Sequence, residues 1–368
     1  WSAPRGRETE QRRLTEMLRS ARVRLTLDCM GGDLGPAAVI EGAKLAQTSG
    51  LDLDFLLFGD KATLEPLVAQ FGLERSEIRH AEGVVAMTDK PAQVLRRGRD
   101  TSMWSAIGAV GDGSARAVVS CGNTGALMAL SWKQLTMIDG VARPAITALW
   151  PTPRGRTVVL DVGANVEATD VELVHFAIMG EAFFRALTGV AKPSVGLLNV
   201  GAEELKGHET IRSAARILRE ADPEMGFQGF VEGDDISKGA VDVVVTDGFT
   251  GNVALKTAEG AARLVGVWLK ETLTASIFTR IGALILRPAL LRLKARMDPS
   301  SVNGGVFLGL NGIVVKSHGG ADALGVKSAI EMAANLAERP FIDDIRQRIA
   351  KVGATAAAVK SDVKAAAV

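Results

Sequence analysis

The stretch VVVTDGFTGNVALKT, residues 243–257, begins as an apolar strand and continues as a helix. The turn between the two parts holds polar and glycine residues, namely Asp247, Gly248, Thr250, Gly251 and Asn252. The same plan recurs in AVVSCGNTGALM at 117–128 and in TVVLDVGANVEAT at 157–169. A chain that repeats strand, polar turn and helix is typical of an α/β fold.

Short β-branched runs alternate with amphipathic segments along most of the chain. We expect strands at 23–28, 53–58, 117–120, 146–150, 157–161, 195–200, 241–246 and 313–316. We expect helices at 36–49, 61–71, 102–111, 124–136, 170–187, 205–220, 251–271 and 319–337. The strands are apolar on both faces, which suits a sheet covered on both sides, and helical crossovers imply parallel pairing. The sequence therefore predicts a doubly wound α/β/α sandwich.

The 368 residues suffice for one large domain or two smaller ones. Residues 1–20 are charged and lack the apolar core of a secretory signal, so we expect a disordered N-terminal extension. No linker composition or fixed-period repeat interrupts 21–352, which favours one catalytic domain there. The alanine-rich stretch 353–368 is expected to be a frayed tail.

Composition excludes several classes of protein. A net charge of +1 gives no field for a nucleic-acid partner. The two cysteines, Cys29 and Cys121, suit a reducing cytoplasm and provide no disulfide framework. The four histidines are scattered, so neither a metal nor a cofactor is expected. No apolar run reaches the ~18 residues that a membrane span requires.

A fourth polar turn, LDCMGGDLGP at 27–36, follows the first expected strand and contains Gly31, Gly32 and Asp33. Ligands of doubly wound sheets bind outside the carboxyl ends of the strands. Helix N-termini there offer unpaired N–H groups and a partial positive charge, which attract an anion. Lys256 follows the 247–252 turn and adds a cation. One such turn alone is ordinary in an α/β protein, but four predict a shared anion site.

The known nucleotide loops do not match this chain. The pattern G-x-x-x-x-G-K-[ST] is absent, and GAVGDG at 108–113 lacks the G-x-G-x-x-G order and a preceding strand. Nucleotide binding through those motifs is therefore disfavoured.

Five motifs carry a resemblance to a known family: DCMGGDLGP, SCGNTGALM, LDVGANVEAT, VGLLNVGAEELKG and VVVTDGFTGNVALKTAEG. In order and spacing, from about residue 23 to about 350, the chain resembles the bacterial phosphate acyltransferases of phospholipid synthesis. That family makes acyl phosphate from acyl-[acyl-carrier-protein] and inorganic phosphate. The resemblance differs at Cys121, where a small residue is usual, and at SHGGAD (317–322), which is usually richer in serine.

The resemblance implies a Rossmann-like α/β/α fold similar to the isocitrate and isopropylmalate dehydrogenases. It also implies a homodimer that docks on the inner face of the cytoplasmic membrane and uses acyl carrier protein and phosphate. A membrane-bound glycerol-3-phosphate acyltransferase would then take the acyl phosphate.

Acyl transfer from a thioester to phosphate requires orientation and stabilisation of an oxyanion, and no covalent nucleophile. We therefore predict catalytic roles for Lys256, Asn252, Asn123, Lys206 and His208. Phosphate contacts are predicted at Gly31, Gly32, Asp33, Gly122, Thr124, Gly163, Asn165, Asp247, Gly248, Thr250 and Gly251. His208 would protonate the departing thiolate, although such a histidine is more often a surface hydrogen-bonding residue. Cys121 is interpreted as a buried structural thiol rather than an acyl-cysteine nucleophile.

The segment MTDKPAQVLRRGRDTSM at 87–103 holds Lys90, Arg96, Arg97 and Arg99. A solvated helix face is the common origin of such a charge run. Two other interpretations stay open, because the basic residues could steer an acidic carrier protein or line the phosphate pocket.

The segment at 272–297 contains five basic residues, no acidic residue and apolar residues at helical spacing. A basic amphipathic helix is typical of peripheral membrane binding. We predict lipid contacts at Ile281, Leu284, Ile285, Leu286 and Arg287, and a helical pair broken or kinked at Pro288 with ALIL (283–286) near its tip. A dimer-interface or core helix is the competing interpretation.

Three rival functions differ in class. A phosphotransacetylase-like enzyme would use coenzyme A thioesters with similar chemistry. A non-enzymatic membrane scaffold for acyl carrier protein would fit 272–297 but would leave four polar turns without a role. A nicotinamide-dependent dehydrogenase would require a carboxylate clamp and metal-binding aspartates that the sequence lacks.

Overall fold

Residues 22–297 and 304–352 are described by the computed structural model, except for the side chains of 292–297. Two compact units make up this part of the chain, and each is described by itself. Unit 1 runs as far as Thr136 and adds Gly312–Pro340, and unit 2 holds Met137–Asn311 and the residues from Phe341. The expected extension and tail lie outside the described residues. The prediction of one domain over 21–352 stays a prediction.

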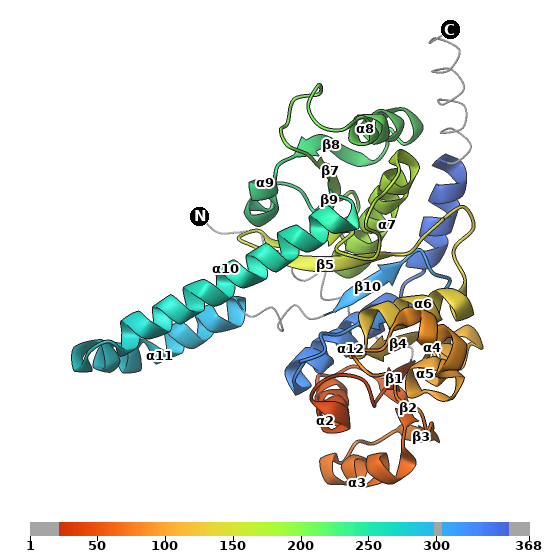
Figure 1. The fold of residues 1–368 in the computed structure, drawn as a ribbon, viewed down its shortest axis with the longest axis vertical. Helices are drawn as coiled ribbons and strands as arrows, with labels where there is room; N and C mark the ends of the chain where they lie inside the picture. The colour runs from red at the N-terminus through yellow and green to blue at the C-terminus, as the bar shows by residue number, and fades with distance from the viewer. Residues whose placement is uncertain (1–21, 298–303, 353–368) are drawn as a thin grey trace, which may run out of the picture. The chain divides into compact units, whose positions relative to one another are not determined.

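Unit 1 is built on a parallel sheet. Its strands, in spatial order, are β3 (Ser76–His80), β2 (Leu53–Gly59), β1 (Val23–Asp28), β4 (Ala117–Ser120) and β11 (Ile313–Lys316). Its helices are α2 (Gly35–Thr48), α3 (Lys61–Phe71), α4 (Pro91–Arg97), the 3₁₀ helix η1 (Gly98–Asp100), α5 (Ser102–Gly111), α6 (Thr124–Leu135) and α12 (Ala323–Ala337). α5 and α12 both pack on β1 and β4, and Figure 1 shows them on different sides of these strands. The predicted sandwich is therefore confirmed in this unit.

Unit 2 contains a mixed sheet. Its strands, in spatial order, are β10 (Gly305–Leu308), β5 (Ala145–Thr152), β6 (Gly155–Leu160), β9 (Val243–Val245), β7 (Ser194–Leu198) and β8 (Gly226–Val231). Its helices are α7 (Asp170–Thr188), α8 (Glu209–Ala221), α9 (Gly233–Lys238), α10 (Gly248–Thr274), α11 (Ile277–Met297) and a helix at 341–352. The prediction of parallel pairing is wrong for β5, which is antiparallel to both β6 and β10. Only residues 153–154 join β5 to β6, and so short a link permits only an antiparallel hairpin.

Side-chain caps fix where the important helices begin. Asn123 accepts a hydrogen bond from the Ala126 N–H at 3.0 Å and starts α6. Asp247 accepts from the Thr250 N–H at 2.8 Å and starts α10. The capping box that the sequence predicts at Thr169 is present at the start of α7. Polar turns thus lead directly into helix N-termini, as expected.

The helices α10 and α11 of unit 2 form a bent pair. α10 and α11 lie side by side, with an angle of 119° at their junction (Figure 1). The predicted break at Pro288 is wrong, because Pro288 lies inside α11. The chain turns near Ser276 instead, where the Ser276 hydroxyl accepts a hydrogen bond from the Thr279 N–H at 3.2 Å and caps the new helix. ALIL is therefore not at the turn.

None of the described helices is long and apolar enough to cross a bilayer by itself. Taken together, α10 and the part of α11 up to Leu291 have the length and hydropathy of a membrane span, but the two helices are bent relative to each other.

Candidate active site

Three neighbouring strands of unit 1 end in polar residues that lie in register. Asp28 of β1 pairs with Ser120 of β4, and Ser120 pairs with Lys316 of β11. All three side chains are buried, at the carboxyl edge of a parallel sheet. This is the edge where ligands of doubly wound folds bind, so the alignment defines a polar centre within unit 1.

The Asp28 carboxylate is held by two hydroxyl groups. Ser102, at the start of α5, donates to Oδ1 at 2.6 Å, and Ser120 donates to Oδ2 at 2.7 Å. Ser120 Oγ in turn accepts from the Gly122 N–H at 3.0 Å. Burial raises the pKa of the Asp28 carboxyl, and the two hydroxyl hydrogen bonds act against that rise. The carboxylate is thus positioned by neutral donors.

Lys316 is a buried cation without a bonded acidic partner. Only 8% of the residue is exposed, and Nζ donates to the carbonyl oxygen of Cys121 at 3.4 Å and to that of Ser317. No carboxylate in the described part of the chain forms an ion pair with it. Burial lowers the pKa of Lys316 to about 8, although the nearby acidic groups oppose this change. An anion beside this ammonium group would offset its lost hydration.

Three glycine-containing turns pack closely around Lys316. A Cβ on Gly31 would lie 2.7 Å from the Gly122 nitrogen, and one on Gly32 would lie 3.1 Å from the Gly319 oxygen. The Asp33 N–H donates to the Gly319 carbonyl oxygen at 2.7 Å. The structure therefore brings together the predicted turns at 27–36 and 117–128, and adds the 316–320 turn to them.

The side-chain amide of Asn123, a predicted donor to phosphate, already forms hydrogen bonds within the protein. Its Nδ2 donates to the carbonyl oxygens of Met87 and Asp89, both at 2.9 Å, while its Oδ1 caps α6. Thr124, the next residue, is exposed in the first turn of α6. In this structure Asn123 positions the turn, and Thr124 faces outward from it.

The Cys121 thiol is buried beside Lys316. Burial raises the pKa of this thiol, and Ser317 and Lys316 act in the opposite direction. A thiol that stays protonated is a poor nucleophile. The geometry is consistent with the structural role expected for it.

In unit 2, the turn after β6 is organised by the buried Asp161. Its carboxylate accepts from the N–H groups of Ile146, Gly163 and Ala164 through Oδ1, and from Asn165 N and Nδ2 through Oδ2, at distances between 2.7 and 3.1 Å. Asn165 is buried, and Gly163 is exposed with a φ of 134° that favours glycine. The predicted residues of this turn are therefore held in place by the Asp161 carboxylate.

The N-terminus of α10 lies directly on that turn. A Cβ on Gly248 would overlap the Asn165 carbonyl oxygen, and one on Gly251 would overlap the Asp161 carbonyl oxygen. Both glycines are buried, whereas Thr250 and Asn252 are exposed. The two glycines therefore allow a close approach, and the polar side chains between them face outward.

The two predicted surface cations have acidic partners. Lys256 Nζ lies 3.0 Å from a Glu259 oxygen, and 56% of its side chain is exposed. Lys206 Nζ lies 2.7 Å from a Glu203 oxygen, and this pairing raises the pKa of Lys206. His208 is exposed at the N-cap of α8. These residues remain candidates, but each is solvated.

Sequence reasoning missed the residues of unit 1 that are most constrained, namely Ser102, Ser120 and Lys316. A detectable signal existed for Lys316, because a lysine ends the apolar run GIVVK at 312–316. The two turns of unit 1 and the two turns of unit 2 were expected to share one site. That expectation stays a prediction, since each unit is described by itself.

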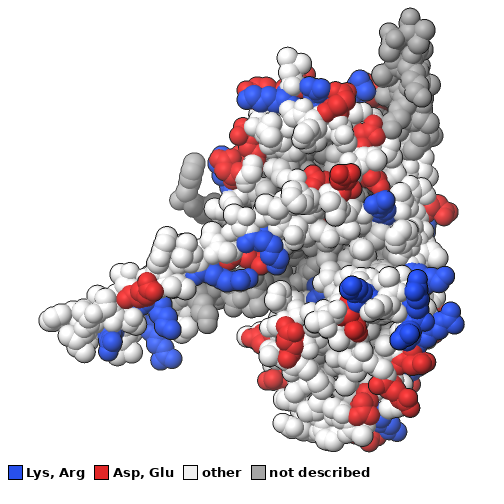
Figure 2. Space-filling model, in the orientation of Figure 1, with Lys and Arg blue, Asp and Glu red and all other residues white. Residues whose placement is uncertain are grey.

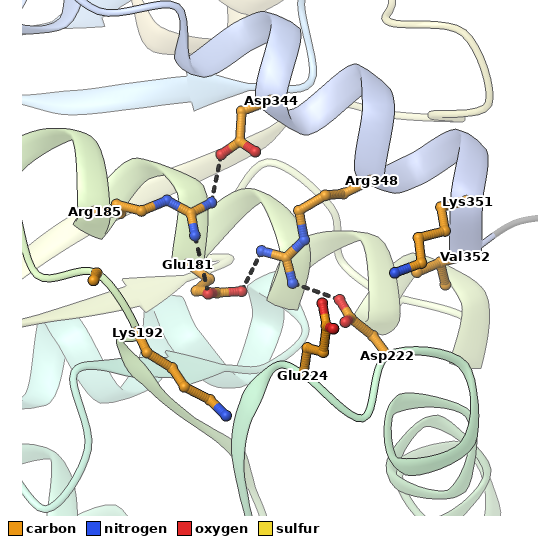
Figure 3. Close-up of a pocket in the computed structure, with 10 residues that line it drawn as sticks. Glu181, Arg185, Lys192, Asp222, Glu224, Asp344, Arg348, Lys351 and Val352 are labelled. Carbon is orange, nitrogen blue, oxygen red and sulfur yellow. Dashed lines mark hydrogen bonds and ion pairs between the residues drawn. The ribbon is translucent and has the colours of Figure 1, made fainter.

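A separate pocket of about 290 Å³ lies in unit 2, at the amino ends of β7 and β8 (Figure 3). Arg348 bridges Glu181 and Asp222, and Arg185 bridges Glu181 and Asp344. These pairs link the helix at 341–352 to α7 and to the end of α8. These five charged side chains are paired with one another, so this part of the pocket is an ion-pair network. Among the described residues no group of three or more His, Cys, Asp or Glu is arranged to hold a metal ion.

Comparison with known proteins gives consistent matches. The family model described as "Fatty acid synthesis protein" matches residues 23–344. A phosphate acyltransferase of Maricaulis maris is 55% identical over 332 residues, covering 89% of this chain and 95% of the relative. A phosphate acyltransferase of Rhodobacter capsulatus is 52% identical over 340 residues, covering 91% and 85%.

Among solved structures, a phosphotransacetylase from Streptococcus pyogenes matches with a TM-score of 0.59 at 16% identity, covering 89% of this chain and 98% of that one. At this identity the likeness concerns the fold alone.

Proposed function

The chain belongs to the phosphate acyltransferase family, and we propose that it transfers a long-chain fatty acyl group from acyl-[acyl-carrier-protein] to inorganic phosphate. The product is an acyl phosphate for phospholipid synthesis. The observation that carries this proposal is the 55% identity to a phosphate acyltransferase over 89% of the chain.

The chemistry is a direct displacement at the thioester carbonyl. A phosphate oxygen attacks the carbonyl carbon, the C–S bond breaks, and the carrier leaves as a thiolate that takes up a proton. The protein has to hold the phosphate and stabilise the carbonyl oxygen as negative charge develops on it. Orientation of the two reactants can lower the barrier by roughly 7–11 kcal/mol.

In unit 1 we assign the phosphate to the polar centre. The Lys316 ammonium would donate to a phosphate oxygen, and the turn would supply the backbone N–H groups of Gly31 and Gly32, while the Asp33 N–H holds the neighbouring 316–320 turn. Support comes from the burial of Lys316 and from its carbonyl-only hydrogen bonds. Asp28 would accept a hydrogen bond from a protonated phosphate oxygen. Gly122 and Thr124 lie at the neighbouring helix N-terminus, which favours an anion.

In unit 2 we keep the predicted contacts of the two turns as part of the proposal. Thr250 and Asn252 face outward from the N-terminus of α10, and Gly163 leaves the Asp161 turn open in front of them. Lys256 adds positive charge one turn further along, while Lys206 and His208 belong to the loop after β7. Proton delivery to the thiolate is assigned to His208.

The reaction is tested by mixing the protein with palmitoyl-[acyl-carrier-protein] and ³²P-labelled phosphate. Labelled acyl phosphate, released with free carrier thiol in equal amounts, is the expected result. Thiol release without labelled product would mean hydrolysis and would contradict the proposal. The same assay with short-chain acyl coenzyme A separates the phosphotransacetylase-like alternative, and an absence of turnover with both donors would favour the scaffold alternative.

We also propose peripheral binding to anionic membranes through α11. Ile281, Leu284, Ile285 and Leu286 are exposed, and Arg287 follows them on a helix whose sequence contains no acidic residue. Basic residues near an anionic surface contribute about 1 kcal/mol each. Leu284→Glu with Leu286→Glu should weaken sedimentation with phosphatidylglycerol vesicles while turnover without vesicles is retained. Unchanged sedimentation would contradict this assignment.

A homodimer is proposed on the exposed apolar side chains of α10, which include Val267 and Trp268. Light scattering after gel filtration should give twice the 38.7 kDa chain mass. A mass equal to one chain at micromolar concentration would contradict the dimer.

A further inference from the structure

One surface of unit 1 is basic and has no acidic partner in the described part of the chain. Lys90, Arg96, Arg97 and Arg99 are all exposed, and none of them forms an ion pair with a described residue. They lie on α4 and on the residues that flank it, and we call these four residues the basic patch. Figure 2 shows blue side chains gathered on this unit, at the position that α4 has in Figure 1.

Helix stability explains only part of this arrangement. Arg96 and Arg97 lie in the last turn of α4, where cations favour the helix dipole by about 0.3–1 kcal/mol. Lys90, however, is the N-cap residue, where the same dipole disfavours a cation. Arg99 lies beyond the helix in η1. Stabilisation of α4 therefore accounts for only two of the four positive charges.

Nearby acidic residues do not cancel the patch. Within 87–100 the acidic side chains are Asp89 and Asp100. Four basic residues and two acidic ones leave this segment with a net charge of +2. Two apolar side chains of the same segment, Met87 and Leu95, are exposed by 43% and 40%. A positive rim around a small apolar contact is typical of a surface that binds an acidic protein.

The patch is joined to the candidate active site by short contacts within unit 1. Asn123 donates to the carbonyl oxygens of Met87 and Asp89, both at 2.9 Å, and so fixes the loop next to Lys90. A Cβ on Gly125 would lie 2.9 Å from the Pro91 ring. The start of α4 thus touches the start of α6, just beyond the strand end that holds Ser120. A protein bound at the patch would therefore lie beside the turn that joins β4 to α6.

We propose that the basic patch docks the acidic carrier protein whose thioester the active site consumes. This inference rests on the proposed function, and it names a binding surface that the reaction alone does not specify. Arg96 and Arg97 attract the carrier by long-range electrostatics, and Leu95 provides the apolar contact. The docked carrier then extends its flexible acyl thioester arm past α4 to the N-terminus of α6.

The test is the double substitution Arg96→Glu with Arg97→Glu, assayed with palmitoyl-[acyl-carrier-protein] at low ionic strength. Because electrostatic steering changes association rates by about 10- to 1000-fold, KM for the acyl carrier should rise at least tenfold. kcat and KM for phosphate should stay within about twofold of wild type, since the two substituted side chains are not among the phosphate contacts proposed above. Added salt should raise KM for the carrier in wild type and have little effect in the variant.

The matched control is Arg156→Glu with Arg216→Glu, which makes the same charge change on two exposed side chains of unit 2. This control should leave KM for the carrier within about threefold of wild type, and an equal rise in both double variants would overturn the docking site. Calorimetric binding of the acyl-free carrier gives a second readout that is independent of turnover. Binding lost in the patch variant and kept in the control supports the site, even if wild type forms no acyl phosphate and the proposed function fails. Unchanged affinity and KM, or a loss only of binding to anionic vesicles or RNA, would overturn it.

Discussion

Two cations, the half-buried Arg348 in unit 2 and the buried Lys316 in unit 1, differ in how their charge is satisfied. Arg348 bridges the carboxylates of Glu181 and Asp222, and both of these acidic side chains are almost completely buried. Lys316 donates hydrogen bonds only to backbone carbonyl oxygens, and the carboxylates of Asp28 and Asp33 act on it without a direct bond. The first arrangement is complete, whereas the second lacks an anion.

The pKa directions express the same contrast. Glu181 and Asp222 raise the pKa of Arg348 against the effect of burial, while burial lowers the pKa of Lys316 to about 8. A cation with bonded carboxylates stabilises the fold, and a cation without them is available to a ligand. This difference separates a structural network from a candidate phosphate site, although both contain buried charges.

The largest expected effect is on stability. Arg348→Met should lower the free energy of unfolding by about 3–5 kcal/mol, because the buried Asp222 carboxylate loses its cation and the buried Glu181 carboxylate keeps only Arg185. Urea unfolding monitored by circular dichroism measures this change. Arg346→Met is the matched control on the same helix, since the Arg346 side chain is 45% exposed in its pair with Asp343. The control should cost less than about 1 kcal/mol, and equal losses for the two variants would remove the contrast.

A smaller effect is expected from pH. Lys316 is protonated below its pKa of about 8 and neutral above it. If the ammonium binds phosphate, kcat/KM for phosphate should fall about tenfold per pH unit on the alkaline side of that value, because kcat/KM reports the free enzyme. In Lys316→Arg the guanidinium stays charged, so this alkaline limb should disappear in any active protein. A wild-type profile that stays flat from pH 8 to 10 would contradict the role of Lys316.

The smallest effects are expected at the exposed residues of unit 2. Lys256→Ala should raise KM for phosphate about two- to fivefold, because a solvated cation that already has a partner contributes little. Asn252→Ala should have an effect of similar size. Thr257→Ala, an exposed neighbour on the same helix, is the control. Phosphate kinetics identical to wild type in both variants would remove unit 2 from the phosphate proposal.

Much of the fold follows from the sequence because strands and helices with clear periodicity are determined locally. All eight expected strands are present, and the Thr169 capping box is where the sequence places it. β3 was missed because its SEIRH sequence is a half-buried edge strand, and β8 was missed because its GFQGFV sequence contains two glycines. The direction of β5 depends on a two-residue connection, which strand periodicity does not report.

The candidate site was less predictable, because its side chains are brought together by tertiary pairing. Turn composition pointed to 27–36 and 117–128, and these two turns meet in unit 1. It could not indicate that the Asn123 side-chain amide donates its hydrogen bonds to carbonyl oxygens of the loop at 86–89. Nor could it indicate that Lys316 ends a strand beside Ser120. Lys316 and the residue that accepts its hydrogen bond, Cys121, are 195 positions apart in the chain.

Phosphate saturation curves of wild type and Lys316→Met, with palmitoyl-[acyl-carrier-protein] as the donor, test the central claim most directly. If the buried ammonium group holds phosphate, kcat/KM for phosphate should fall by about 10²–10³, the usual cost of removing one strong donor from such a site. Urea unfolding should meanwhile show that Lys316→Met is no less stable than wild type, because a buried cation is costly to the fold. A folded Lys316→Met protein with the phosphate kinetics of wild type would contradict the account.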